Sequence, residues 1–236
     1  MMIKEQKRLL TMLKENKISE DDYQIISAAL NKKSVFSNIE NSILINPFQK
    51  IAGLQALGLG LILMVAMSLT GIATDAYFDG IIGYMIPLGL KTAVKPNFFL
   101  LLYQNAAAVF ITASMFITVS LLFRQKRIRI IDFFGTVALA RFPLFISILF
   151  TMLEKHLSPS HFKEDISKGI ELHLTLLGTV GNLIFLTCLI WQIATYFFAL
   201  KEASGLEGKS LWRGFLIAIL LGDVAGIILT RLFLYV

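Results

Sequence analysis

Four polar side chains stand inside segments that are otherwise apolar enough to cross a membrane: Asp132, Arg141, Asn182 and Asp223. An arginine near the middle of a membrane helix costs about 2.5 to 3.5 kcal/mol on insertion scales, so it needs a partner or a wet cavity. Counted from the expected cytoplasmic ends of their helices, Arg141 lies about 20 Å deep and Asp223 about 16 Å deep. Opposite charges at similar depths should meet, so we predict that Arg141 and Asp223 pair inside the bundle.

The predicted pair has two interpretations, which the sequence leaves open. It can fix the packing of the bundle, or it can line a path for a proton, an ion or a polar solute together with Asn105 and Asn182. The discontinuous helices and repeated halves of many transporters are not visible in the sequence. Pro143 follows Arg141 by two residues and is expected to kink that helix and free a backbone carbonyl.

No constellation of side chains predicts an enzyme. The run Gly205–Ser210 resembles the end of a phosphate-binding loop, but Ala203 stands where that motif requires glycine. The histidines have no metal-binding spacing, and the single cysteine, Cys188, allows neither a disulfide within the chain nor a multi-thiolate metal site. We therefore predict no catalytic residue, no cofactor and no metal site.

The composition is that of a polytopic membrane protein. Hydrophobic residues make up 56% of the 236 positions and charged residues only 16%, which excludes an ordinary soluble domain. The net charge of +6 does not indicate nucleic acid, because lysine and arginine stand in short loops beside apolar runs. We predict an all-α bundle of five transmembrane helices, at Ile51–Ile72, Phe98–Phe123, Ile128–Leu153, Ile170–Leu200 and Trp212 to the carboxyl end.

The charge of the loops orients these helices. Short loops rich in lysine and arginine stay in the cytoplasm, and five spans then place the amino terminus in the cytoplasm and the carboxyl terminus outside. We expect a multi-pass protein of the cytoplasmic (inner) membrane. Asp132, next to the boundary, is expected to contact the adjacent basic loop. The basic loops are the cluster Arg124, Lys126, Arg127 and Arg129 and the segment Lys201–Arg213.

The segment Gly80–Leu90 is apolar but too short to cross about 30 Å of hydrocarbon. Glycine and proline break it, so we expect an interfacial or a re-entrant piece of the first outer loop. The sequence leaves these two alternatives open.

Small residues recur every fourth position in two of the predicted spans. Ala52, Ala56 and Gly60 do so in the first span, and Gly222 and Gly226 form a GxxxG in the fifth. Such stripes let another helix approach closely. For the fifth span the sequence allows packing within the chain or homodimerisation.

The first 46 residues are polar and predict a separate cytoplasmic segment of two short helices, before a transmembrane domain at 47–236. Ser19 is a good N-cap for a helix over Glu20–Leu30, and Asp22 stands where a capping box places its acid. The run Asn16–Tyr23 resembles the SHOCT-type helical hairpin of bacterial membrane proteins, which implies a role in oligomerisation.

Short motifs from residue 46 onward resemble those of a known family. They are Asn46–Phe48, Asp132–Thr136, Ala140–Pro143, Trp191, Ala199–Leu206 and Lys209. With them the chain resembles the Yip1 domain of small five-span membrane proteins, which implies five helices with a cytoplasmic amino terminus. Eukaryotic members of this family act in vesicle traffic and contact Rab-type GTPases, but the short amino-terminal segment here differs from their long tails. The chain resembles more the bacterial branch of the family, which has no settled activity.

These observations favour a non-enzymatic membrane scaffold or adaptor. Its partners would be the lipid bilayer, a second copy of the chain or a protein at the cytoplasmic face, recruited by the amino terminus and the basic loops. The alternative is a transporter or channel for a small solute or ion that uses Arg141 and Asp223.

Overall fold

The computed structural model describes residues 9–13, 15, 18–28, 42–86, 95–123, 128–157 and 176–232, with side chains from 178 onward in the last range. Contacts divide the chain into two units, Met1–Pro47 and Phe48–Val236. In the first unit, residues 9–13 and 20–28 are helical. The Ser19 hydroxyl accepts a hydrogen bond from the Asp22 amide at 3.1 Å and donates one to its carboxylate at 2.6 Å. The predicted helix start and its capping pair are therefore confirmed.

The second unit is an all-α bundle, as the sequence predicts. After a short 3-10 helix, η1 (Pro47–Gln49), the described residues contain five spans that are long and apolar enough to cross a membrane. The chain is thus a multi-pass membrane protein. Its helices are α3 (Gly53–Thr74), α4 (Phe98–Leu122), α5 (Ile130–Leu139) with α6 (Phe142–Leu157), α8 (Leu176–Ser204) and α9 (Gly208–Arg231).

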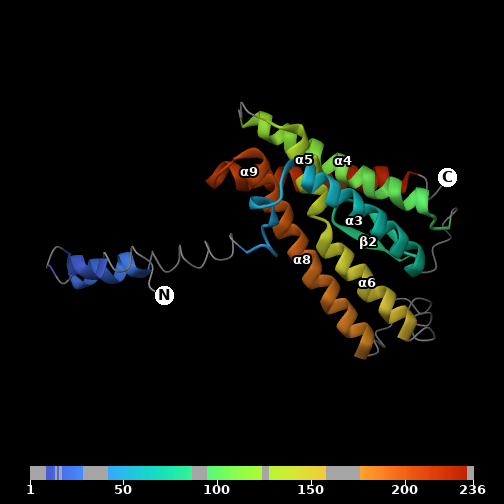
Figure 1. Ribbon diagram of the computed structural model, residues 1–236, viewed down its shortest axis with the longest axis horizontal. Helices are drawn as coiled ribbons and strands as arrows, with labels where there is room; N and C mark the ends of the chain where they lie inside the picture. Colours follow the sequence, from blue (N-terminus) through green and yellow to red (C-terminus); the bar gives the residue numbers. More distant parts are fainter. Residues whose placement is uncertain are drawn as a thin grey trace. The chain divides into compact units, whose positions relative to one another are not determined.

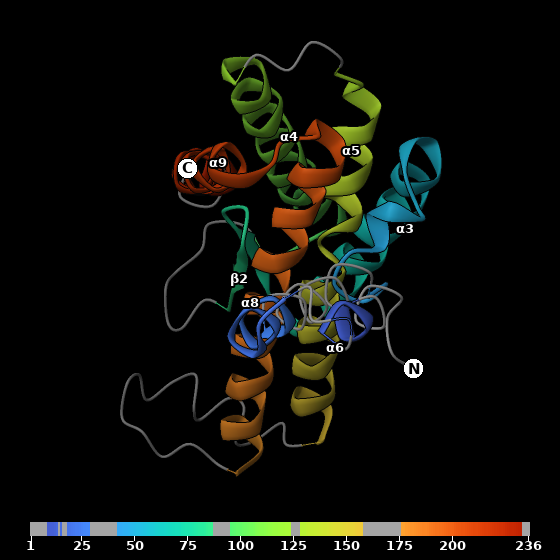
Figure 2. The same ribbon diagram turned by 90° about the vertical axis from the view of Figure 1, so that its left-hand side faces the viewer.

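The spans pack in neighbouring pairs. Helix α3 lies against α5, α4 against α9 and α6 against α8 (Figures 1 and 2). We call the end where α3 and α6 finish the Lys155 end, because Lys155 there contacts Asp75. The opposite end, where α9 begins, is the Lys209 end.

Small residues allow α3 and α5 to approach closely. A Cβ atom on Gly60 would lie 2.5 Å from the Cβ of Ala138, and one on Gly135 would lie 2.8 Å from the Gly53 carbonyl oxygen. Ala56, one turn before Gly60, is fully buried. The small-residue stripe predicted in the first span is therefore a contact between helices of the same chain.

The third span is interrupted beside Pro143, where the sequence predicts a kink, and the interruption divides it into two helices. Helix α5 ends at Leu139 and α6 begins at Phe142, so Arg141 stands in the break. Pro143, the second residue of α6, has no amide hydrogen to continue the helical pattern backwards. The Ala140 carbonyl accepts a hydrogen bond of 2.9 Å from the Thr195 hydroxyl of α8. A side chain of the neighbouring helix thus satisfies a carbonyl at the break.

A short β-hairpin enters the bundle from the Lys155 end. Strands β1 (Tyr77–Asp79) and β2 (Gly83–Met85) pair antiparallel, and Gly80, Ile81 and Ile82 form the turn. Phe78 and Ile81 are fully buried. Asn105, which contacts the same site as the turn, lies about 10 Å along α4 from its start at Phe98. Of the segment Gly80–Leu90, residues 80–86 are described, and Ile81 in their turn is buried among the helices, which favours the re-entrant alternative. Residues 87–90 lie outside the described part.

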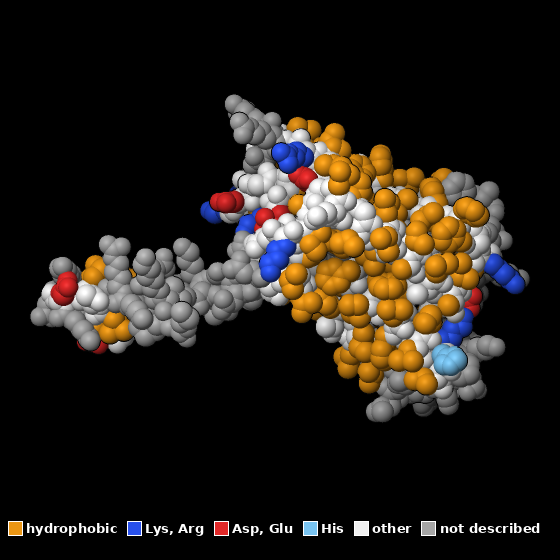
Figure 3. Space-filling model, viewed as in Figure 1, with side chains coloured by type: hydrophobic (Ala, Val, Ile, Leu, Met, Phe, Trp, Pro, Cys, Tyr) orange, Lys and Arg blue, Asp and Glu red, His pale blue; other side chains and the backbone are white. Residues whose placement is uncertain are grey.

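Apolar side chains cover much of the surface of this unit. Figure 3 shows hydrophobic side chains over most of one face, with lysine and arginine near its edges. Helix α3 is one example. It exposes large apolar side chains along its length, and such a surface suits a lipid environment. They are Leu54, Leu59, Leu61, Ile62, Val65 and Leu69.

Candidate functional site

The polar groups inside the bundle converge on the backbone of one residue, Ile81, at the turn of the hairpin. We call this set of residues the Ile81 hub. Its side chains come from α4, from the break between α5 and α6, from α8 and from α9. They are Asn105, Arg141, Gln192, Tyr196 and Asp223.

The carbonyl side of the hub is built around Arg141, whose side chain is fully buried. Its Nη1 donates to the Ile81 carbonyl at 3.1 Å and to the Tyr196 hydroxyl at 3.4 Å, and its Nη2 donates to Asn105 Oδ1 at 3.2 Å. Its Cζ lies 5.8 Å from the centre of the Phe78 ring. The guanidinium is thus surrounded by neutral groups, although it carries a full charge.

Two further donors reach the same carbonyl oxygen from α8. The Tyr196 hydroxyl donates to it at 3.0 Å and Gln192 Nε2 at 3.3 Å. Both side chains are fully buried, and they lie one helical turn apart, so they share a face of α8. Three donors therefore surround a single backbone oxygen.

The amide side of the hub is held by α9. The Ile81 amide donates to Asp223 Oδ1 at 3.1 Å, and the Gly80 amide donates to the Thr230 hydroxyl at 3.1 Å. Gly80 has φ +63°, and a Cβ atom there would lie 2.5 Å from Asp223 Oδ1. Glycine is required at Gly80 both by the left-handed backbone and by this close approach.

The predicted direct pair of Arg141 and Asp223 is wrong. The two residues lie at similar depths, as expected, but one binds the carbonyl of Ile81 and the other its amide. Backbone groups at membrane depth need partners inside the protein. The two charged side chains satisfy this need of the inserted turn, and no pattern in the sequence indicates that a backbone segment comes between them.

The GxxxG of α9 receives the hairpin turn as well as helix α4. A Cβ atom on Gly226 would lie 2.9 Å from Ile81 Cγ2 and 3.1 Å from the Gly80 carbonyl carbon, and one on Gly222 would lie 3.2 Å from Ile81 Cδ1 and 3.6 Å from Met115 of α4. The expected packing within the chain is therefore present, but the turn is its closest partner. The two glycines form a notch for Ile81.

Two of the predicted polar candidates lie away from the hub. Asn182 is exposed on α8 and contacts none of the residues of the hub. Asp132 is in the first turn of α5, where its carboxylate lies 3.4 Å from the position of a Cβ on Gly53. Of the basic cluster expected to contact it, Arg124, Lys126 and Arg127 lie outside the described residues. Arg129 is described, and its carbonyl oxygen accepts a hydrogen bond of 3.0 Å from the Asp132 amide.

Sequence reasoning missed Gln192 and Tyr196, and it assigned no bonding role to Gln104. The Gln104 Oε1 accepts from the Phe78 amide at 3.0 Å and its Nε2 donates to the Thr230 carbonyl at 2.9 Å. One feature of the sequence could have pointed to these residues: amide and phenol groups within apolar helices are expected to be buried, and a buried polar group requires a hydrogen-bond partner. It indicates that partners exist but does not identify them.

The second strand and the last residue of the first strand, beside the turn, are also anchored. Arg231 Nε donates to Asp79 Oδ1 at 2.7 Å, and the second guanidinium nitrogen binds Oδ2. The Tyr84 hydroxyl lies 2.7 Å from Thr151 Oγ1 and 3.1 Å from Ser147 Oγ, both on α6. Burial raises the pKa of Tyr84, so its hydroxyl keeps the proton that it can donate there.

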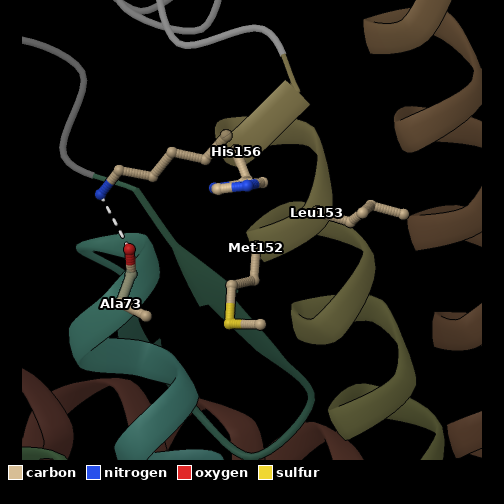
Figure 4. Close-up of a pocket in the computed structure, with 5 residues that line it drawn as sticks. Ala73, Met152, Leu153 and His156 are labelled. Carbon is tan, nitrogen blue, oxygen red and sulfur yellow. Dashed lines mark hydrogen bonds between the residues drawn. The ribbon is translucent and has the colours of Figure 1, made fainter.

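A separate open cavity of about 490 Å³ lies at the Lys155 end. Figure 4 shows Met152 and His156 of α6 on the side that faces Ala73 of α3, while Leu153, which also lines the cavity, points away from Ala73. Lys155 closes the gap between the two helices, because its Nζ donates to the Ala73 carbonyl at 2.9 Å and to Asp75 Oδ2 at 2.6 Å. None of the residues that line this cavity belongs to the Ile81 hub.

The part of the chain that the structure describes places no three His, Cys, Asp or Glu side chains together as a metal site. His161 and His173 lie outside it. No protein-family model, no curated protein and no solved structure matches this chain.

Proposed function

We propose that this chain is a non-enzymatic membrane scaffold of the Yip1-like kind that its residues resemble. The five-span bundle anchors it in the bilayer, and the amino-terminal segment and the basic loops recruit a protein partner or a second copy at the cytoplasmic face. The amino-terminal segment has a defined helix start at Ser19 and Asp22, which supports a folded binding element there.

The observation that carries the proposal is the complete burial of Arg141. Its two terminal nitrogens contact backbone and side-chain oxygens that hold the hairpin in the bundle. A charged group that lines a water-filled path would expose part of its surface to that path. The contacts of Arg141 instead favour a rigid bundle that serves as an anchor.

Cross-linking and co-purification from native membranes test this proposal. The intact chain is compared with one that lacks residues 1–46 and with the full-length double variant Ser19→Ala, Asp22→Ala, which removes the helix cap. We expect a specific partner or a defined oligomer with the intact chain, its loss on truncation, and weaker capture with the uncapped variant, because the cap contributes about 1 kcal/mol.

Gel filtration in detergent is the control, since the truncated bundle must remain monodisperse for the comparison to count. An identical particle from all three proteins, with no partner, would overturn the scaffold proposal.

Passage of a small solute or an ion is a second candidate. The break at Ala140–Arg141 favours it, because discontinuous helices form the binding sites of many transporters. In this form of the proposal Arg141 and Asp223 act as separate groups. Solute uptake into sealed liposomes, lost in Arg141→Gln with the protein still folded, would support it over the scaffold.

A further inference from the structure

The number of donors around the Ile81 carbonyl exceeds what a backbone oxygen needs. Arg141 Nη1, Tyr196 Oη and Gln192 Nε2 lie at 3.1, 3.0 and 3.3 Å from it. A carbonyl oxygen offers two lone pairs, and one neutral donor would satisfy it. Using a buried arginine adds a desolvation penalty that a neutral side chain would avoid. The side chains of the Ile81 hub therefore offer more hydrogen-bond donors, and more positive charge, than the Ile81 carbonyl requires.

The distances also show that a neutral carbonyl is a poor partner for this guanidinium. Hydrogen bonds from arginine to an anionic oxygen are typically about 2.7 to 2.9 Å. Arg231 reaches that range with Asp79, at 2.7 Å. The three bonds of Arg141 are 3.1, 3.2 and 3.4 Å long. An oxyanion would suit the Arg141 donors better than the groups that now surround them.

Two polar atoms of the hub have no hydrogen-bond partner. They are Arg141 Nε and Gln192 Oε1, and both belong to fully buried side chains. An oxyanion with two oxygens can accept at once from Nε and Nη2, whose hydrogens lie on the same edge of the guanidinium, as Asp79 does from Arg231. On Arg141 the Nε of this edge is unpartnered and Nη2 binds Asn105, while the Ile81 carbonyl binds the other terminal nitrogen, Nη1.

The residue that fills the site belongs to a small, separable element. The hairpin has two three-residue strands, and Ile81 sits in the notch of Gly222 and Gly226. A two-stranded hairpin has little stability of its own, so its position depends on these contacts. The hydrogen bond from the Ile81 amide to Asp223 favours the return of the turn after an anion leaves. The negative charge of Asp223 would repel an anion beside it, so this charge limits the affinity of the site.

We propose that Arg141, Tyr196 and Gln192 form a binding site for an oxyanion, a carboxylate or a phosphate group, and that the Ile81 turn is a plug that fills the site when no anion is bound. Binding of the anion displaces the Ile81 carbonyl and moves the turn toward the Lys155 end. The anion is a dissolved ion or the headgroup of an anionic lipid. The site does not depend on whether the chain recruits partners.

Cysteine accessibility of the turn tests the proposal. The full-length chain carries Cys188→Ser, which removes its single cysteine, and Ile82→Cys in the turn. It is placed in nanodiscs of phosphatidylcholine and labelled with a membrane-impermeant maleimide while inorganic phosphate or acetate replaces chloride at constant ionic strength. A second arm uses nanodiscs with phosphatidylglycerol and no added phosphate. We expect the labelling rate to rise about fivefold to a plateau, the lower end of usual coupling between two sites.

The control variants separate the site from general salt effects. Arg141→Gln keeps a donor for the carbonyl but removes the charge, and its labelling should not respond to the anion. Arg231→Gln removes an arginine that binds Asp79 beside the turn, and it should raise the basal rate while keeping the anion response. A response only to phosphatidylglycerol assigns the anion to a lipid headgroup, and a response to dissolved phosphate or acetate assigns it to a free ion.

Two results would overturn the proposal: a labelling rate that no anion changes in the folded chain, or the same response in Arg141→Gln. If Arg141→Gln does not fold, Tyr196→Phe takes its place, because it removes one donor and keeps the ring. The anion concentration at half-maximal labelling should then rise about threefold to tenfold, as for one lost hydrogen bond, and an unchanged midpoint would equally count against the site.

Discussion

At the scale of single residues, the backbone of Ile81 organises the polar interior. Peptide groups that enter the hydrocarbon region without helical bonding must find partners in the protein. Here Asp223 satisfies the amide, while Arg141, Tyr196 and Gln192 satisfy the carbonyl. Polar residues of the spans thus stabilise one inserted turn, and each contributes through the group that it offers to that turn.

The contact of Asp223 with the Ile81 amide predicts different effects for two substitutions. Asp223→Leu leaves a buried amide without an acceptor, and we expect it to lower the free energy of unfolding by about 1 to 3 kcal/mol. Asp223→Asn keeps an oxygen acceptor and should cost clearly less. Thermal unfolding of both variants in detergent measures the difference. If the two variants are equally unstable, the negative charge matters more than the hydrogen bond, and a charge partnership with Arg141 regains support.

The notch for Ile81 predicts that Gly226→Ala is destabilising. The added Cβ would meet the Gly80 carbonyl carbon and the Ile81 nitrogen at 3.1 Å, and these backbone atoms move only with the whole turn. We expect a loss of about 1 to 3 kcal/mol, as in other overpacked sites. Gly58→Ala is the matched control, since nothing lies within 4 Å of its Cβ position. It should be neutral or gain up to about 1 kcal/mol from helix propensity. Equal melting temperatures for the two variants would argue against the notch.

At the scale of the elements, the break between α5 and α6 sets the position of Arg141. The chain leaves the helix at Ala140, and Thr195 of α8 binds the carbonyl there. Helix α8 therefore fixes the break with one side chain and supplies Gln192 and Tyr196 to the hub with two others. The break and the hub share their supporting helix.

This arrangement predicts that Thr195→Val weakens the break. The substitution keeps the shape of the side chain but leaves the Ala140 carbonyl without the Thr195 hydroxyl, and we expect a cost of about 1 kcal/mol or more. Amide hydrogen exchange near Arg141 should become faster. Thr187→Val is the control on the same helix, because the Thr187 hydroxyl bonds only the Leu183 carbonyl of its own helix. Unchanged exchange at the break would show that Thr195 is not its support.

The sequence predicts the elements better than it predicts the hub, for a physical reason. Hydropathy and the spacing of small residues are local properties, and they located the five spans and the contact of Gly60 with the neighbouring helix. The hub depends on which distant residues meet. The pairing of Arg141 and Asp223 followed from depth alone, and depth could not reveal that the turn at Ile81 would stand between them.

At the scale of the whole molecule, two ion pairs join the loop that carries the hairpin to the helices of the second unit. Lys155 with Asp75 and Arg231 with Asp79 link the ends of α6 and α9 to the segment between α3 and α4. The pair of Lys155 and Asp75 is partly exposed and contributes at most about 1 kcal/mol. The pair is more useful as a marker of orientation than as a source of stability, because it lies at the end of the bundle opposite Lys209.

One candidate span, α8, separates His156 from Lys209 along the chain. We therefore predict that these two residues lie on opposite sides of the membrane. Both side chains are exposed, one near the end of α6 and the other at the start of α9. In a Cys188→Ser background, we expect His156→Cys to react with an impermeant maleimide added to intact cells. Lys209→Cys should react only after the membrane is opened, because basic loops stay in the cytoplasm.

Ile62→Cys, on the apolar surface of α3, serves as the control that should react slowly in both conditions, since hydrocarbon keeps a thiol protonated and away from the reagent. Labelling of Lys209→Cys in intact cells, with His156→Cys protected, would reverse the orientation. The re-entrant hairpin would then open toward the cytoplasm, and an oxyanion would reach Arg141 from inside the cell. The pattern we expect places the hairpin and its anion site on the outer side.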